Sequence, residues 1–316
     1  MSRPLLILHI GSQKTGSTAI QSALDACPQS LAQSGLRFAS AGRNHISHNR
    51  MWQAFVANRP RPPFLRLREE LKANPDATHI LSCEMFLRPE VAQVFARFLS
   101  APQRARTRVI VYLRRQDEYF EAMYKQHLKN GRFKGDVAAY RAFLGDRLAY
   151  APILDAFDTA FGRENLIVVP YERAEFPGGN VVADFAHRVG WQAPPTDALG
   201  SGQTNASLAL PYCQALGTLP DLTPPVRRHL IRALIADPSG KTLAGNDCLT
   251  ATERAAMLAE FADDNARTCA TWTKGRTTLF SEPITTTVKP AISLDAARTH
   301  IETLLPTAPA ALDTPT

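Results

Sequence analysis

The sequence is poor in cysteine and lysine and has no long apolar run, and each scarcity excludes a class of protein. Its 316 residues include five cysteines, an odd number with no CxxC pair. The chain therefore carries neither a disulfide scaffold nor a standard zinc site. No stretch approaches the 18 apolar residues of a transmembrane helix. The apolar run at residues 5–8 is too short for a signal-peptide core. We expect a cytoplasmic protein without a membrane span.

The charged residues are mainly arginines. Lysine and arginine total 36 against 29 acidic residues, a net charge of +7, and 28 of the 36 are arginine. Arginine favours planar, bidentate contact with phosphate or carboxylate. An anion-binding surface for a nucleotide or an acidic substrate is one interpretation, and a solvated basic face is the other. We expect no nucleic-acid partner, because no zinc finger, RNA-binding signature or aromatic–basic interleaving is present.

Short apolar runs alternate with helical segments along the first 190 residues. Runs without a polar gap are typical of buried parallel strands. The alternation predicts an α/β fold, a P-loop-like doubly wound parallel sheet flanked by helices. The expected strands are residues 5–10, 79–83, 108–113 and 165–170, with a shorter one at 35–38.

Strand signals stop after residue 190, and the C-terminal region is expected to be mostly helical. We expect three parts: an α/β core at residues 1–200, a helical region at 201–307 packed on it, and a flexible tail at 308–316. The expected helices of the second part are residues 224–236, 251–269 and 293–304.

The loop after the first strand has the composition of an anion-binding turn. Glycines let the backbone turn tightly, and successive N–H groups at a helix N-terminus cradle an anion. Gly11, Gly16 and Thr18 keep the spacing of the nucleotide-binding pattern G-x-x-x-x-G-K-[ST]. Ser17 occupies the lysine position, however, and Lys14 lies three residues earlier. An ordinary strand–turn–helix connection is the alternative.

The strand at residues 108–113 ends in Arg114 and Arg115 instead of a magnesium-binding aspartate. We therefore expect the first loop to bind a phosphate-like anion without a metal. In doubly wound sheets the carboxyl ends of the strands face the ligand, so two guanidinium groups there can clamp a second phosphate. Alternatively, they pair with acidic residues of the following helix.

Together the two segments resemble the sulfotransferases that use 3′-phosphoadenosine-5′-phosphosulfate (PAPS). The sequence HIGSQKTGST at residues 9–18 resembles that family's 5′-phosphosulfate loop, and YLRRQD at 112–117 resembles its 3′-phosphate motif. The resemblance implies PAPS as donor and adenosine 3′,5′-bisphosphate as product. It implies nucleotide contacts from Gly11, Gln13, Lys14, Thr15, Gly16, Ser17, Thr18, Arg114, Arg115 and Tyr171.

Other segments add to the resemblance, with one departure. The segment around Glu84 resembles the strand end where carbohydrate-type members carry a catalytic glutamate, and Tyr171 lies in a segment resembling one near the nucleotide. The family has a serine eight residues after the 3′-phosphate arginine, whereas this chain has Ala122. One hydroxyl donor to the 3′-phosphate is therefore missing.

Sulfuryl transfer builds negative charge on the oxygen that bridges to the leaving phosphate, and Lys14 is suited to stabilise it. The acceptor hydroxyl needs a base in reach. Glu84 is the first candidate, and His45 and His48, in an irregular segment, compete with it. His9 falls inside the first strand, where we expect a structural role.

The expected activity is metal-independent transfer from PAPS to a hydroxyl of a glycan, a glycolipid or another small metabolite. Two other functions stay open. One is a nucleotide-dependent phosphotransferase with a degenerate P-loop. The other, suggested by Ala122, is a protein that binds adenosine 3′,5′-bisphosphate without catalysis.

Overall fold

The computed structural model consists of two compact units that are interleaved along the chain. Residues 116–148 group with most of the C-terminal third, and residues 261–282 group with the N-terminal part, so one boundary near residue 200 does not separate the units. The expected tail at 308–316 lies outside the described residues. Unit 1 comprises Met1–Arg115, Ala149–Gln203 and Phe261–Glu282, and unit 2 comprises Gln116–Leu148, Thr204–Glu260 and Pro283–Thr316. The structure describes residues 3–192, 194, 207–219, 222–238, 240, 242–243, 247–284 and 292–305.

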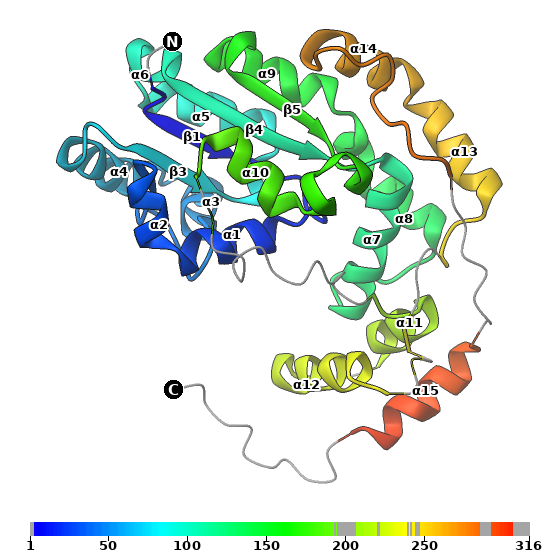
Figure 1. Ribbon diagram of the computed structural model, residues 1–316. Coiled ribbons are helices and arrows are strands. Elements are labelled where there is room, and N and C mark those ends of the chain that lie inside the picture. The colour runs from blue at the N-terminus through cyan, green and yellow to red at the C-terminus, as the bar shows by residue number, and fades with distance from the viewer. Residues whose placement is uncertain are drawn as a thin grey trace. The chain divides into compact units, whose positions relative to one another are not determined.

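Unit 1 contains a five-stranded sheet in which every pair of neighbours is parallel (Figure 1). Its order is β2-β3-β1-β4-β5, so β1 lies in the middle, between β3 and β4. The predicted α/β fold and all five predicted strands are confirmed. The strands are β1 (Leu6–His9), β2 (Leu36–Phe38), β3 (Thr78–Ser82), β4 (Thr107–Leu113) and β5 (Leu166–Pro170).

Helices cover both faces of this sheet because alternate residues of each strand face opposite sides. On β1, Leu6 and Leu8 join one apolar cluster with Phe64 and Phe157, whereas Ile7 joins a second cluster with residues such as Ile20. The first cluster draws on α4 (Arg61–Ala73), α5 (Pro89–Phe98), α9 (Ala151–Phe161) and α14 (Ala262–Trp272), and the second on α1 (Ser17–Ala26), α2 (Pro28–Gln33) and α10 (Val181–Val189). Shorter helices of this unit are α3 (Asn49–Val56) and α6 (Ala101–Ala105).

The described part of unit 2 is helical and holds no strand of the sheet. A buried arginine, Arg254, ion-pairs with Asp117 at 3.0 Å and also with Glu121, which joins α13 to α7. Substitution of one partner would destabilise the fold, because it would leave the other charge buried without a counter-charge. The helices are α7 (Gln116–Lys129), α8 (Val137–Leu144), α11 (Leu210–Thr218), α12 (Pro224–Ile235), α13 (Ala251–Glu260) and α15 (Leu294–Thr303).

The single helix predicted at residues 251–269 was wrong. It divides into α13 and α14 at Phe261, where the backbone (φ −102°, ψ 14°) departs from helical angles and the ring is buried. The two halves belong to different units. Among the helices that the structure describes, none is both long and apolar enough to cross a membrane.

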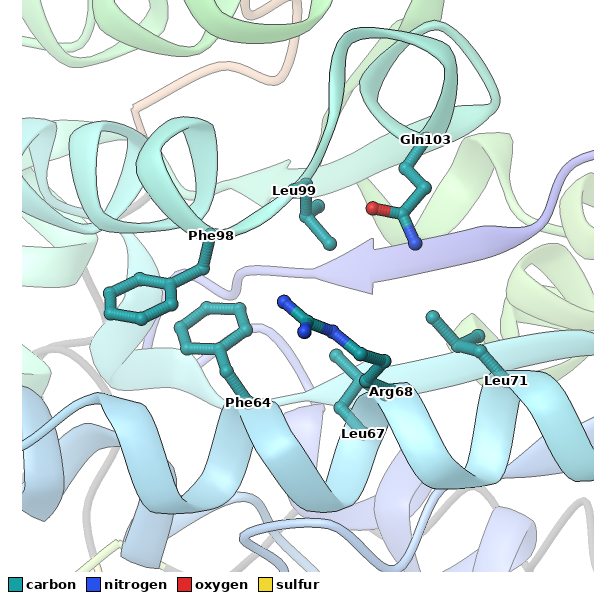
Figure 2. Close-up of a pocket in the computed structure, with 7 residues that line it drawn as sticks. All are labelled: Phe64, Leu67, Arg68, Leu71, Phe98, Leu99 and Gln103. Carbon is teal, nitrogen blue, oxygen red and sulfur yellow. The ribbon is translucent and has the colours of Figure 1, made fainter.

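A small pocket lies between α4 and the segment from the end of α5 to α6 (Figure 2). The rings of Phe64 and Phe98 stack in it at 4.6 Å, and Leu71, Leu99 and Gln103 also line it. Leu71 precedes β3, and Leu99 and Gln103 precede β4. The pocket therefore belongs to the amino-terminal side of the sheet and is separate from the loop after β1.

Candidate active site

Four predicted segments meet at the carboxyl edge of the sheet. The loop with Gly11 follows β1, and Glu84 follows β3 by one residue. Arg114 follows β4 directly, and Tyr171 follows β5 directly. Because the strands are parallel and adjacent in the order β3-β1-β4-β5, their carboxyl ends place these residues along one edge.

Two positions in the loop require glycine. A Cβ on Gly11 would lie 2.8 Å from the Cα of Glu84, and one on Gly16 would lie 2.6 Å from Val181 Cγ1. Both residues also have positive φ angles, 99° and 79°, which disfavour a side chain. The loop therefore packs directly against the backbone of Glu84.

Some polar groups of the loop form hydrogen bonds within the loop, and others have no partner among the described residues. The hydroxyls of Thr15 and Ser17 donate to the Ser12 carbonyl oxygen at 2.6 and 3.0 Å. The backbone N–H groups of Thr15, Gly16, Ser17 and Thr18 make no hydrogen bond to any residue that the structure describes. Four consecutive donors at the N-terminus of a ten-residue helix form a cradle for an anion.

Arg114 lies against the same loop. Its Nη1 donates to the Lys14 carbonyl oxygen at 2.9 Å, and Tyr150 donates its hydroxyl to the Arg114 carbonyl oxygen. Lys14 has a positive φ of 66°, so the loop turns sharply at this residue. The structure thus brings Arg114, to which the resemblance assigns the 3′-phosphate, into contact with Lys14, one of the loop residues to which it assigns the phosphosulfate.

Arg115 has a different environment from the one expected. Its side chain is buried, and Nη1 donates to the Glu282 carbonyl oxygen at 2.6 Å. The same segment is held by Glu172, which accepts hydrogen bonds from the N–H groups of Ser281 and Glu282 and from Arg276. Burial raises the pKa of Glu172, but the hydrogen bonds from the N–H groups of Glu282 and Ser281 outweigh it and hold the pKa below its usual value. Arg115 thus helps to fix residues 276–282 to the edge of the sheet.

Tyr171 lies beside the start of α1. Its N–H donates to the Leu113 carbonyl oxygen at 2.7 Å, continuing the β4–β5 pairing by one residue. Its hydroxyl accepts a hydrogen bond from Arg173 Nε at 3.3 Å and lies 3.8 Å from the Cβ position of Gly16. This half-buried side chain therefore borders the cradle.

Glu84 lies on the opposite side of the loop from Arg114. It begins the short 3-10 helix η1 (Glu84–Phe86) and is half-buried. Its Oε2 accepts a hydrogen bond from Gln21 Nε2 at 3.3 Å. Next to it, Gln13 Nε2 donates to Met85 Sδ at 3.4 Å, a second contact between the loop and η1. Gln21 thus orients the carboxylate of Glu84 beside the loop.

The two candidate histidines are placed very differently. His48 is fully buried, and its Nδ1 accepts the Ser82 N–H at 3.0 Å while Nε2 donates to the Ala39 carbonyl oxygen at 3.0 Å. Burial lowers its pKa to about 4, so the ring is neutral at pH 7. Both ring nitrogens are occupied by backbone groups, which leaves none for an acceptor hydroxyl. His45 is exposed, in the turn between Asn44 and Ser47.

Sequence reasoning missed Ser82 and Gln21, two side chains that the structure joins to His9 behind Glu84. His9 Nδ1 and Ser82 Oγ lie 2.7 Å apart, and Gln21 Nε2 donates to Ser82 Oγ at 3.1 Å. The available signal was the polar spacing of α1: Ser17 and Gln21 are four residues apart, on the face that also buries Ile20 and Leu24. Ala122, the position of the missing serine, lies on α7 in unit 2.

Within the described residues, no group of three or more histidine, cysteine, aspartate and glutamate side chains gathers as metal ligands.

No protein-family model matches the chain. An uncharacterised protein of Archaeoglobus fulgidus is 32% identical over 117 residues, which are 36% of this chain and 31% of that protein. The aligned part thus spans less than a third of that relative's length. The crystal structure of a sulfotransferase from Alicyclobacillus acidocaldarius has a TM-score of 0.47 at 16% identity, covering 85% of this chain and 96% of that one.

Proposed function

We propose that this protein is a PAPS-dependent sulfotransferase that moves a sulfuryl group in line to an acceptor hydroxyl without a metal ion. The observation that carries the proposal is the row of four N–H donors from Thr15 to Thr18, which have no hydrogen-bond partner among the described residues and belong to the loop between Arg114 and Glu84. The donors suit the 5′-phosphosulfate, Arg114 suits the 3′-phosphate, and Glu84 lies on the other side of the loop. Tyr171 borders the nucleotide.

Lys14 is the group that we assign to the bridging oxygen of the leaving phosphate. Negative charge builds on that oxygen only as the S–O bond breaks, so a cation there stabilises the transition state more than the bound donor. The loop holds this residue through Arg114, which donates to its carbonyl oxygen. Lys14 would thus take the role of the lysine in the usual P-loop pattern, a position that is Ser17 in this chain.

We assign the base to Glu84. Its carboxylate lies beside the cradle and is not engaged in an ion pair among the described residues. His48 is buried and neutral, with both nitrogens occupied, so we give it a structural role. His45 is exposed in a turn, and it stays the alternative base.

The acceptor that we propose carries an alcohol hydroxyl on a glycan, a glycolipid or a small metabolite. An alcohol is a weak nucleophile and gains from proton removal as the new S–O bond forms, a contribution of about 10²–10⁴-fold. A phenol, which ionises more readily, needs less help. The size of the loss of kcat on removing the Glu84 carboxylate therefore distinguishes an alcohol acceptor, for which the loss is large, from a phenol, for which it is small.

The test compares ligands and then variants. We expect calorimetry to show binding of adenosine 3′,5′-bisphosphate without magnesium and weaker binding of ATP with magnesium. The reverse order would favour the phosphotransferase. Binding of the bisphosphate without transfer of labelled sulfate from PAPS to any sugar, glycolipid or phenol acceptor would favour the non-catalytic binder.

The base is tested with Glu84→Gln, which keeps the shape of the side chain but cannot accept a proton. We expect kcat to fall by about 10²-fold or more with little change in PAPS affinity. His45→Ala is the matched comparison. If His45→Ala loses that activity while Glu84→Gln stays near wild type, the assignment of Glu84 is wrong.

A further inference from the structure

A buried row of polar side chains runs from the middle of the sheet to Glu84. It begins at His9 on β1, continues through Ser82 on β3 and Gln21 on α1, and ends at Glu84 on η1. His9 and Ser82 are 0% exposed and Gln21 is 3% exposed. Such groups cost free energy to bury unless they are hydrogen-bonded, so the row is either a fold requirement or a device for the site.

The direction of the hydrogen bonds follows from the chemistry of each group. Gln21 presents its NH₂ group to Glu84 Oε2, and the same nitrogen donates to Ser82 Oγ. Ser82 then has its own hydrogen for His9 Nδ1, 2.7 Å away. Burial lowers the pKa of His9 to about 3, which leaves the ring neutral and able to accept. Gln21 therefore donates one hydrogen bond toward Ser82 and one toward Glu84.

The position of Gln21 does not require a polar side chain for folding. Its neighbours on the buried face of α1, Ile20, Ala23 and Leu24, belong to an apolar cluster. An apolar residue there would continue that cluster. The side-chain amide instead contacts two groups, Ser82 and the carboxylate at the edge of the cradle.

We propose that Gln21 is a positioning residue, which Ser82 and His9 hold in place and which fixes the Glu84 carboxylate toward the acceptor. This inference rests on the proposed function, in which Glu84 is the base. Gln21 touches neither substrate in this account and acts only through Glu84. Its effect on turnover must therefore vanish when Glu84 can no longer accept a proton.

A double-mutant cycle tests this dependence. Gln21→Met keeps the length of the side chain and removes the donor, and we expect kcat with an alcohol acceptor such as octyl β-glucoside to fall about 10- to 100-fold, the range of one hydrogen bond to a charged group. In a Glu84→Gln background the same change should cost less than twofold. Equal losses in both backgrounds would show a general structural effect and overturn the proposal.

Two controls separate this inference from the proposed function. Leu24→Met changes a buried residue on the same face of α1 and should leave kcat unchanged. Affinity for adenosine 3′,5′-bisphosphate should be the same in Gln21→Met and wild type. Wild-type protein that binds no bisphosphate and transfers no sulfate would contradict the proposed function itself.

Crystal structures test the positioning without any activity. In wild-type crystals we expect Glu84 Oε2 within hydrogen-bond distance of Gln21 Nε2. In Gln21→Met crystals we expect the Glu84 carboxylate to leave that position. A Glu84 side chain that keeps the same rotamer and place in the variant would overturn the proposal, whatever the assay shows.

Discussion

The environment of His48 leads to a prediction about how the stability of the fold depends on pH. In the folded chain, burial lowers the pKa of His48 from 6.5 to about 4. The unfolded chain therefore binds a proton at this residue at a higher pH than the folded chain does. The stability that His48 contributes is fully present above about pH 6.5 and is lost as the pH falls toward 4.

The size of the effect follows from the same two values. Between pH 7 and pH 5, protonation of the unfolded state alone lowers the free energy of unfolding by about 2 kcal/mol at this one residue. His48→Gln removes the titration, so the variant should lose about 2 kcal/mol less than wild type over this interval. His9 is present in both proteins, and its contribution cancels in the comparison.

Urea unfolding at pH 7 and pH 5, followed by circular dichroism, measures the four free energies. We expect His48→Gln to be less stable than wild type at pH 7, because it loses a fitted pair of backbone hydrogen bonds, and the gap to narrow at pH 5. Equal pH dependence in the two proteins would refute a neutral, buried imidazole. A loss of kcat in a fully folded His48→Gln variant would instead indicate that His48 takes part in catalysis.

Two further predictions concern the nucleotide site. Arg114→Ala should weaken adenosine 3′,5′-bisphosphate about 10- to 100-fold and adenosine 5′-phosphate far less, because a charge-assisted contact contributes about 1.5–3 kcal/mol. Calorimetry with both ligands decides this, and equal weakening would assign Arg114 to the bracing of the Lys14 carbonyl oxygen instead. Turnover of labelled PAPS should survive EDTA, because the strand before Arg114 ends without an acidic residue. Turnover that disappears with the chelator and returns with magnesium would support the phosphotransferase.

Local patterns were sufficient to predict the strands and the loop. The four longer strands, β1, β3, β4 and β5, are short, mostly apolar runs that are largely buried on both faces, which a parallel sheet requires. Gly11 and Gly16 could be recognised from their spacing in the sequence, and their positive φ angles and close contacts explain why both positions exclude a side chain. The parallel pairing of β1 with β3 brings the end of β3, and so Glu84, beside the loop.

Contacts between distant segments could not be predicted. Arg115 donates to a carbonyl oxygen 167 residues away, at Glu282, and nothing in the local sequence distinguishes it from Arg114. The pair of histidines at residues 45 and 48 suggested a site, but the end of β3 buries His48 by accepting and donating backbone hydrogen bonds. A buried polar residue that bonds to the backbone cannot be distinguished from a catalytic residue in the sequence until its hydrogen-bond partners are known.

The most direct test of the account is transfer of labelled sulfate from PAPS by wild type, Lys14→Ala and Lys72→Ala, which changes a lysine in the last turn of α4. We expect Lys72→Ala to match wild type. Lys14→Ala should retain the far-ultraviolet spectrum and unfolding midpoint of wild type and lose more than about tenfold in kcat, over 1.4 kcal/mol of transition-state stabilisation. A folded Lys14→Ala protein with more than about a tenth of the wild-type kcat would contradict the central role of the loop lysine.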